Sequence, residues 1–230
     1  VYEIKKGIVV TGTRTAKQIE SNPIATEVVT GDEIKKAGGL RLDNVLSEET
    51  GLFMVEDHGK GIQIQGLDPD YALILINGEP IIGRNGGVLD LKRLAMGNVK
   101  RVEVVKGPSS CMYGSNALSG VINIITEEPT QPFEFGLSAR GESFNTYDLN
   151  ANAGAVFLNS DLGMNFYFDR LSSDGFTLRQ ADDNLTGMES YGKTVPEYTN
   201  YTFSGELFYN FSPTLSAKLG ARMNTEDQKN

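Results

Sequence analysis

Five segments in the second half of the sequence alternate between apolar residues and polar or small ones. The clearest is LGMNFYFDR at 162–170, in which every second residue from Leu162 to Phe168 is apolar. The same pattern recurs at 133–141, 147–157, 199–211 and 215–224. Because successive side chains of a strand point to opposite faces, each segment is predicted to be a strand with one apolar face. Five such strands in succession all need an apolar environment for that face, which restricts the fold strongly.

The connections between these segments alternate in length. They are a short link near 142–146, the turn LNSD at 158–161, a polar loop from about 172 to 198, and the turn FSP at 211–213. Short turns at one end and longer loops at the other are typical of a transmembrane β-barrel. Alternation alone also fits a soluble meander or sandwich, so these patterns leave both architectures open.

The first half of the sequence predicts an α+β domain. Strands are expected at 62–65, 72–76, 101–105 and 121–125, bounded by Gly, Asp, Asn and Pro. TGDEIKKAGG places Thr30 and Glu33 at capping-box spacing with Gly38 as a stop. LDNVLSEETG repeats this plan and ends at Gly51, so two short surface helices are expected. The composition shifts at TEEPTQP, 126–132, which predicts a boundary there.

Composition excludes several classes of function. The formal net charge of −9 argues against a nucleic-acid partner, because phosphate binding needs a basic face. With one cysteine, Cys111, and one histidine, His58, the chain cannot build a Cys/His zinc cluster. No nucleophile–base–orienter set and no phosphate-binding glycine loop is found, so we do not expect an enzyme.

The segment VEVVKGPSSCMYGSNALSGVINIIT, residues 102–126, identifies the family that the sequence resembles. It resembles the C-terminal part of the plug domain of TonB-dependent outer-membrane receptors. YALILINGEPI at 71–81 and IQIQGLDPDY at 62–71 are similar to upstream parts of that plug. Gln65 stands where the family usually has Arg, so the salt bridge often inferred for that Arg is not expected here.

GIVVTGTR at 7–14 resembles the energy-coupling segment called the TonB box. Taken alone it is only a β-prone string near a terminus, typical of an edge strand. The resemblance implies that it binds the periplasmic protein TonB by adding a strand to that protein's sheet. The residues implied in this contact are Ile8, Val9, Val10, Thr11 and Gly12.

The resemblance implies three parts: a TonB-box-like segment at 1–14, a plug domain at 15–130, and the first five or so barrel strands at 131–230. An open sheet in hydrocarbon leaves unpaired backbone groups, and a family-like barrel has roughly 22 strands. We therefore expect the barrel to be incomplete here and the gene product to continue past Asn230.

The turn between the two β-branched runs of the motif is expected to act as a plug hinge. The glycines permit φ > 0 or close backbone approach, and Pro108 suits the start of a helical turn. The expected hinge residues are Gly107, Pro108, Tyr113, Gly114 and Gly120. Cys111 is expected to be a small buried filler rather than a nucleophile.

The resemblance places two loops of the plug toward the outside of the cell, EDHGKG and GRNGG. The residues expected to contact solute are Asp57, His58, Lys60, Arg84 and Asn85. The alternative is that they are ordinary solvated loop residues. DDNLTGMESYGK at 182–193 begins like an EF-hand loop but ends in Lys193, so no metal ligands are predicted. A looser calcium site at Asp182 and Asp183 stays open.

The function that the resemblance implies is TonB-driven uptake through the bacterial outer membrane. The solute would be an iron–siderophore, haem or a corrinoid, with no covalently bound cofactor and with outer-membrane lipid and TonB as partners. Two alternatives are a surface-binding or sensory receptor without transport, and a glycan or peptide importer. For the barrel strands the expected lipid-facing residues are Phe133, Leu149, Phe166, Phe203 and Leu219. The expected lumen-facing residues are Glu134, Asn150, Asn165, Ser204 and Lys218.

Overall fold

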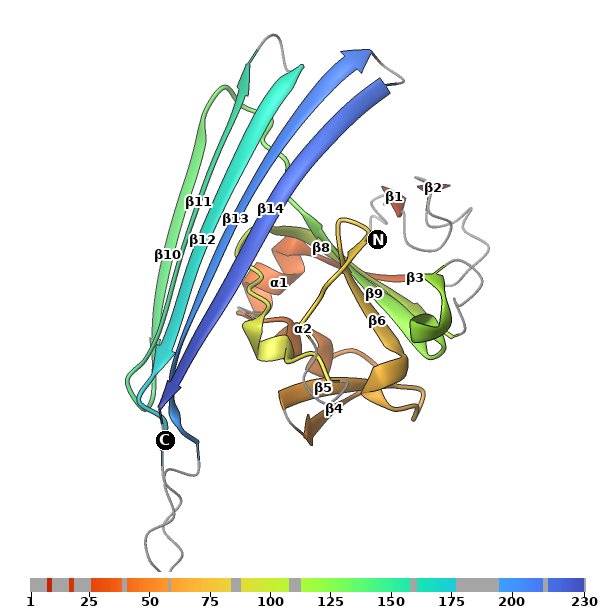
Figure 1. Cartoon of the computed structure of the whole chain (residues 1–230), viewed down its shortest axis with the longest axis vertical. Helices are drawn as coiled ribbons and strands as arrows, with labels where there is room; N and C mark the ends of the chain where they lie inside the picture. The colour runs from red at the N-terminus through yellow and green to blue at the C-terminus, as the bar shows by residue number, and fades with distance from the viewer. Residues whose placement is uncertain are drawn as a thin grey trace, which may run out of the picture. The chain divides into compact units, whose positions relative to one another are not determined.

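The computed structural model has two compact units, Val1–Glu127 and Glu128–Asn230. They divide just before the boundary expected at residue 130, and Figure 1 shows the elements of both. The structure describes residues 8–9, 17–18, 26–38, 41–57, 59–83, 88–107, 113–157, 161–176, 195–212 and 215–229.

The first unit is built on a five-stranded sheet with the order β3-β8-β9-β6-β7. Its strands are β3 (Thr26–Thr30), β6 (Ala72–Ile76), β7 (Glu79–Pro80), β8 (Val99–Lys106) and β9 (Gly120–Thr126). β6 and β9 pair in parallel, and the other neighbours are antiparallel. A separate antiparallel hairpin joins β4 (Leu52–Asp57) to β5 (Gly59–Ile64). The predicted α+β class is confirmed, with β5 ending before Gln65, whose φ of 54° begins a turn.

Alternation along β6, β8 and β9 supplies apolar side chains to both faces of this sheet. Ile74, Val104 and Ile122 belong to the main core, which also takes side chains of both helices and of the β4–β5 hairpin. Leu75 and Val121 belong to a smaller cluster on the other face, together with Ala117 and the partly buried Tyr113. The sheet is therefore covered on both sides, as its nearly continuous β-branched runs require.

The first helix, α1 (Gly31–Ala37), forms as expected. The Thr30 hydroxyl accepts from the Glu33 N–H, the Glu33 carboxylate accepts from the Thr30 N–H, and Gly38 closes the helix with φ of 70°.

The second helix, α2 (Leu42–Ser47), differs from the prediction in length and position. It ends at Ser47, whose hydroxyl donates to the Asn44 carbonyl, while Gly51 with φ of 76° belongs to the turn before β4. Leu42, Val45 and Leu46 are spaced along one helix face and are buried in the main core. The expected surface helix is therefore a core helix.

The described part of this unit also contains three short 3₁₀ turns and a two-stranded pair. They are η2 (Pro69–Tyr71), η3 (Leu91–Arg93), η4 (Ser115–Ala117), β1 (Ile8–Val9) and β2 (Lys17–Gln18). The β6–β7 turn has φ of 51° at Asn77 and 85° at Gly78, as a two-residue hairpin turn of type I′ requires. The Asn77 side chain is fixed by donating to the Thr126 hydroxyl and accepting from the Thr126 N–H.

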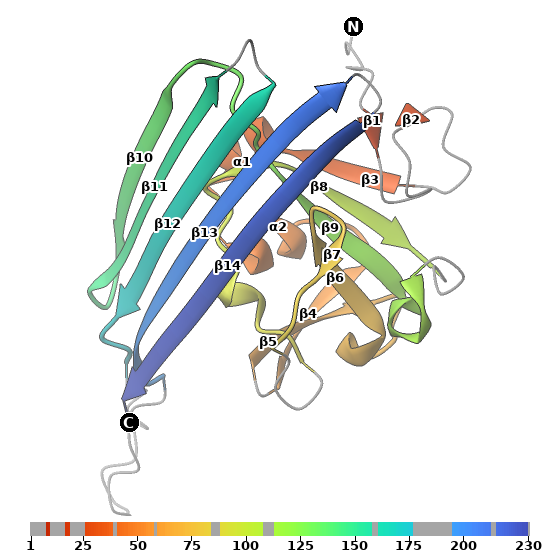
Figure 2. The ribbon, with the colours of Figure 1, turned by 45° about the horizontal axis from the view of Figure 1, so that its top comes forward.

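The second unit is one twisted sheet of five long strands in chain order (Figure 2). They are β10 (Glu134–Glu142), β11 (Thr146–Phe157), β12 (Leu162–Ser173), β13 (Glu197–Ser212) and β14 (Leu215–Lys229). The five predicted strands and their antiparallel order are confirmed. β14 runs further than expected because β13 offers it partners as far as Glu197, which is opposite Lys229.

The register separates the side chains of this sheet into two faces. Phe166 is opposite Ala153 and Gly205, and Phe168 is opposite Ala151 and Phe203, so these residues share what we call the apolar face. Asn165 is opposite Gly154 and Glu206 on what we call the polar face. Of the residues expected to face lipid, Leu149, Phe166, Phe203 and Leu219 lie on the apolar face, while Phe133 precedes β10 and lies outside the paired strands. The residues expected to face the lumen all lie on the polar face.

Large apolar side chains are exposed on the apolar face. Phe166 is 58% exposed, Phe203 is 47% exposed and Leu219 is 74% exposed. A soluble sandwich would need to bury these side chains against a second sheet. Among the described residues, no helix is long and apolar enough to span a membrane.

Candidate functional site

The first unit contains a polar network at the base of both loops expected to contact solute. Lys60 lies at the start of β5, directly after the β4–β5 turn. Asp57 is paired with Gly59 at that turn, whereas His58, Arg84 and Asn85 lie outside the described residues. The network therefore shows how the loops are held rather than how their tips are arranged.

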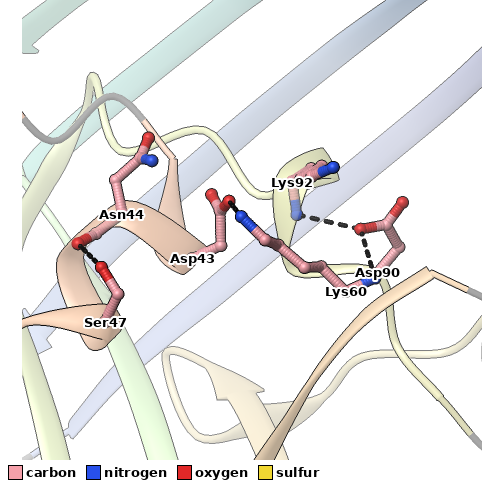
Figure 3. A network of polar contacts seen from close by, with 6 residues as sticks. All are labelled: Asp43, Asn44, Ser47, Lys60, Asp90 and Lys92. Carbon is pink, nitrogen blue, oxygen red and sulfur yellow. Dashed lines mark hydrogen bonds and ion pairs between the residues drawn. The ribbon is translucent and has the colours of Figure 1, made fainter. Parts of the chain in front are cut away.

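The Lys60 side chain is engaged inside the domain. Its Nζ donates to Asp43 Oδ2 at 2.9 Å, and Figure 3 shows the side chain pointing toward α2. The Asp43 side chain is 4% exposed and the Lys60 side chain 25% exposed. Such a partly buried pair is hard to open, because the carboxylate would lose its cation in a poorly solvated place.

Asp90 joins the second loop to the same hairpin. Its Oδ1 accepts from the backbone N–H groups of Lys60 and Lys92, each at 3.2 Å (Figure 3). Arg93 Nε lies 3.7 Å from Asp90 Oδ2. The Asp90 carboxylate thus caps η3 and binds the backbone of β5. It therefore connects the chain that follows the second loop to the chain that follows the first.

Close packing at Gly61 brings a third segment to the same place. A Cβ at Gly61 would lie 2.8 Å from Val88 Cγ1 and 3.0 Å from Pro69 Cγ. Only a glycine leaves room for both neighbours, so η2, the Val88 segment and β5 converge here. This arrangement can hold two loops as one rigid platform.

The network leaves one polar atom without a described partner. Asp43 Oδ1 is buried and accepts no hydrogen bond among the described residues. A buried carboxylate oxygen without a donor makes the ion pair to Lys60 more important, because it is the contact that compensates the charge. Asp43 and Asp90 were not predicted as site residues. The sequence feature that could have identified Asp43 is its position as an acidic residue on the buried face of an amphipathic helix.

The predicted hinge has the backbone geometry that its glycines suggested. Gly107 and Gly114 have φ of 105° and 86°. A Cβ at Gly120 would lie 2.3 Å from the Val105 carbonyl oxygen, so that glycine permits a close backbone approach. Pro108 lies outside the described residues, while Tyr113 packs beside the smaller core cluster. These facts describe a tight connection between β8 and β9.

Lys106, the basic residue of the motif, is bound within the first unit. Its Nζ lies 2.5 Å from Glu27 Oε2 and donates to the Thr50 carbonyl. Burial, followed by the neighbouring Glu27 carboxylate, raises the pKa of Glu49, and Lys106 opposes this rise. The lysine therefore offsets the repulsion of an acidic cluster beside the hinge.

Two strand residues of the TonB-box-like segment are described. Ile8 is opposite Gln18 and Val9 opposite Lys17 in the antiparallel pair of β1 and β2. Val10, Thr11 and Gly12 lie outside the described residues, as does the 182–193 segment considered for calcium. The β1 residues have extended backbone, which is the conformation needed to add a strand to another sheet.

The polar face of the second unit carries a line of charged and amide side chains. Lys218 Nζ lies 3.2 Å from Glu206 Oε2 and 3.4 Å from Glu128 Oε1. Asn224 donates to the Thr202 hydroxyl at 2.8 Å. Such a face is suited to water or to polar protein surface and not to hydrocarbon.

Comparisons with known proteins agree on one family. Residues 18–121 match the TonB-dependent Receptor Plug Domain. The vitamin B12 transporter BtuB of Vibrio cholerae is 28% identical over 211 residues, covering 88% of this chain and 34% of that protein. BtuB of Vibrio vulnificus is 27% identical over 233 residues, covering 91% of this chain and 38% of that protein. The chain therefore spans about a third of the length of these curated relatives.

Solved structures share the fold over nearly all of the chain. FpvA of P. aeruginosa, bound to heterologous pyoverdines, aligns with a TM-score of 0.78 at 20% identity, covering 97% of this chain and 28% of that one. The siderophore receptor PirA from Acinetobacter baumannii aligns with a TM-score of 0.69 at 21% identity, covering 88% and 32%. At these identities the likeness concerns the fold.

Proposed function

Because this chain belongs to the family of TonB-dependent receptors, we propose that it serves the uptake of a large, scarce solute through the bacterial outer membrane. The solute class we propose is an iron–siderophore, haem or a corrinoid. Relatives named as vitamin B12 transporters and neighbours named as siderophore receptors support this class. The family's members are transport receptors and not enzymes.

One observation carries the proposal: a domain of the plug family is followed directly by a sheet whose apolar face is exposed. The row of β12 side chains on the apolar face runs from Leu162 to Arg170, which is about 27 Å along the strand at ~3.4 Å per residue step. At a tilt of about 40° this is roughly 21 Å along the membrane normal, close to the ~25 Å apolar band of outer-membrane barrels. The match in height supports a lipid-facing role for this face.

In the proposed mechanism the platform formed by β5, η2, η3 and the Val88 segment presents two loops to the solute. Asp57, His58, Lys60, Arg84 and Asn85 are the proposed contacts. For Lys60 we propose contact only through the exposed part of its side chain, which is 25% exposed, because its Nζ is paired with Asp43. TonB then pulls on the segment at Ile8–Gly12, and the plug moves around Gly107, Pro108, Tyr113, Gly114 and Gly120.

Growth with one limiting solute tests this function. Cells carrying or lacking the intact gene are supplied with an iron–siderophore, haem or a corrinoid as the sole source of iron or cobalamin. We expect gene-dependent growth on one of the three. Equal growth with and without the gene on all three, together with binding of a solute at the cell surface, would favour a sensory or surface-binding receptor. Gene-dependent growth on a glycan or peptide would favour the other alternative.

A further inference from the structure

The apolar face of the second unit is hollowed by a groove of about 510 Å³. Phe135, Phe166, Phe168 and Phe203 line it, together with the small residues Ala153 and Gly205. The rings of Phe168 and Phe203 lie 5.0 Å apart between centroids, so they form one edge together. The volume falls within the roughly 300–1,000 Å³ of small-molecule sites. All of these residues share the apolar face by register.

A cation lies next to this groove on the same face. Arg170 follows Phe168 by two residues and is opposite Leu149 and Tyr201 in the ladder. Its Nε donates to the Tyr201 hydroxyl at 3.4 Å, and its guanidinium lies 5.9 Å from the Tyr201 ring centroid. No described carboxylate lies within 4.0 Å of Arg170. The next row beyond it on this face consists of Tyr147, Ser172, Thr199 and Asp227, so the face becomes polar there.

The position of Arg170 corresponds to the outer edge of the apolar band. The connection after β12 is the long one, at 174–196, and long loops of such barrels lie outside the cell. Arginine and tyrosine are typical of the interface between hydrocarbon and head groups. A guanidinium there can form two parallel hydrogen bonds to a phosphate.

We propose that Arg170 and the groove form a binding site for one anionic phospholipid or phosphoglycolipid of the outer leaflet. The phosphate binds Arg170, and one acyl chain occupies the groove between the phenylalanines. The groove alone cannot select a lipid, because any acyl chain is as apolar as its walls. Selection comes from the net charge of the head group. This inference rests on the proposed membrane insertion of the apolar face.

The test uses the full-length receptor purified in neutral detergent and supplied with dimyristoyl phosphatidate or dimyristoyl phosphatidylcholine. Native mass spectrometry measures how much of each lipid the protein retains. We expect wild type to prefer the anionic lipid about five-fold, which corresponds to the ~1 kcal/mol that one basic residue contributes to binding at an anionic membrane surface. Arg170→Gln should abolish the preference, and Arg170→Lys should retain only part of it.

Arg140→Gln is the matched control, because Arg140 lies at the same height on the polar face. Ala139 is opposite Leu149, which is opposite Arg170. Gly205→Leu should lower retention of both lipids by filling the groove. A Cβ there would lie 3.4 Å from Phe166 Cδ1, an ordinary contact. Heat-modifiable migration in gels shows that each variant is folded.

Three results would overturn the proposal. The first is that Arg170→Gln keeps the wild-type preference for the anionic lipid. The second is that inorganic phosphate displaces the anionic lipid completely, as expected of an adventitious ion only. The third is that the lipid-free receptor forms a dimer through this groove, which Gly205→Leu disrupts. A receptor that inserts and takes up its solute but shows no lipid preference contradicts the lipid site alone. Failure to insert contradicts the proposed function as well.

Discussion

At the scale of residues, the Lys60–Asp43 pair shows how the plug holds its loops. Asp43 is almost fully buried on α2, and the Lys60 ammonium lies 2.9 Å from it across 17 positions of sequence. Asp90 adds a second link by accepting from the Lys60 backbone. Two contacts of one residue, one through its side chain and one through its backbone, therefore connect α2, β5 and η3.

Lys60→Met should destabilise the β4–β5 hairpin. The change leaves the Asp43 carboxylate buried without its cation, which costs about 3 kcal/mol, the lower end for broken buried pairs because Lys60 is partly exposed. Hydrogen–deuterium exchange at the amides of Ile62 and Ile64 measures the local opening. Lys92→Met is the control, because Lys92 takes part in the network through its backbone N–H. Equal exchange in the two variants would mean that the pair does not stabilise the hairpin.

The capping box of α1 should make that helix sensitive to acid. The Thr30 backbone N–H, followed by the Thr30 hydroxyl, lowers the pKa of Glu33 from 4.5. A lowered folded-state pKa means that the stabilisation is complete above about pH 4.5 and is lost as the pH falls through the folded value. The protection of the α1 amides, measured as exchange relative to the intrinsic rate at each pH, should therefore fall as the pH drops below about 4.5, and Glu33→Gln should remove this pH dependence. Asp32→Asn, in the same turn, should keep it.

At the scale of elements, the connection between β8 and β9 depends on the absence of side chains. Gly120→Ala would place a Cβ 2.3 Å from the Val105 carbonyl oxygen, and backbone must move to relieve this. We expect the free energy of unfolding to fall by about 1–3 kcal/mol, which should appear as faster amide exchange in β9. Gly114→Ala is the comparison, because its Cβ meets nothing within 4 Å and only the φ of 86° is strained. A larger effect at Gly114 would contradict this explanation.

The two faces of the long strands should report two environments. Spin labels at Phe166, Phe203 or Leu219 should be accessible to oxygen dissolved in lipid, because these residues are exposed on the apolar face. Labels at Asn150, Asn165 or Ser204 should be accessible to a polar relaxation agent, or protected from both that agent and oxygen, because these residues are on the polar face. Reversed accessibilities in the full-length receptor would disprove the assignment of the faces.

The elements that local sequence controls were predictable, and those that distant contacts control were not. The alternation at 162–170 and the Thr30–Glu33 spacing predicted β12 and α1, because period and capping act within a few residues. The spacing of Leu42, Val45 and Leu46 marks one apolar face of α2, but the strands against which that face packs lie elsewhere in the sequence, so the depth of its burial was not predicted. The partners of Lys60 and Arg170 likewise lie on other elements, where no local pattern points to them.

At the scale of the whole molecule, the chain contains two units: a plug domain in which two loops are held by one polar network, and a sheet with one apolar and one polar face. Both units fit the proposed function in energy-coupled uptake. In that proposal the energy enters through the N-terminal GIVVTGTR segment. Of this segment the structure describes Ile8 and Val9, which are extended and paired in β1.

The most direct test of energy-coupled uptake replaces residues 7–13 with a Gly/Ser segment of the same length in the full-length receptor. This change keeps the length of the tether but removes the side chains that would select TonB. Surface binding and internal accumulation of the labelled solute are measured in the same cells. We predict that accumulation is lost while binding affinity is unchanged. Accumulation at the wild-type rate would contradict the account.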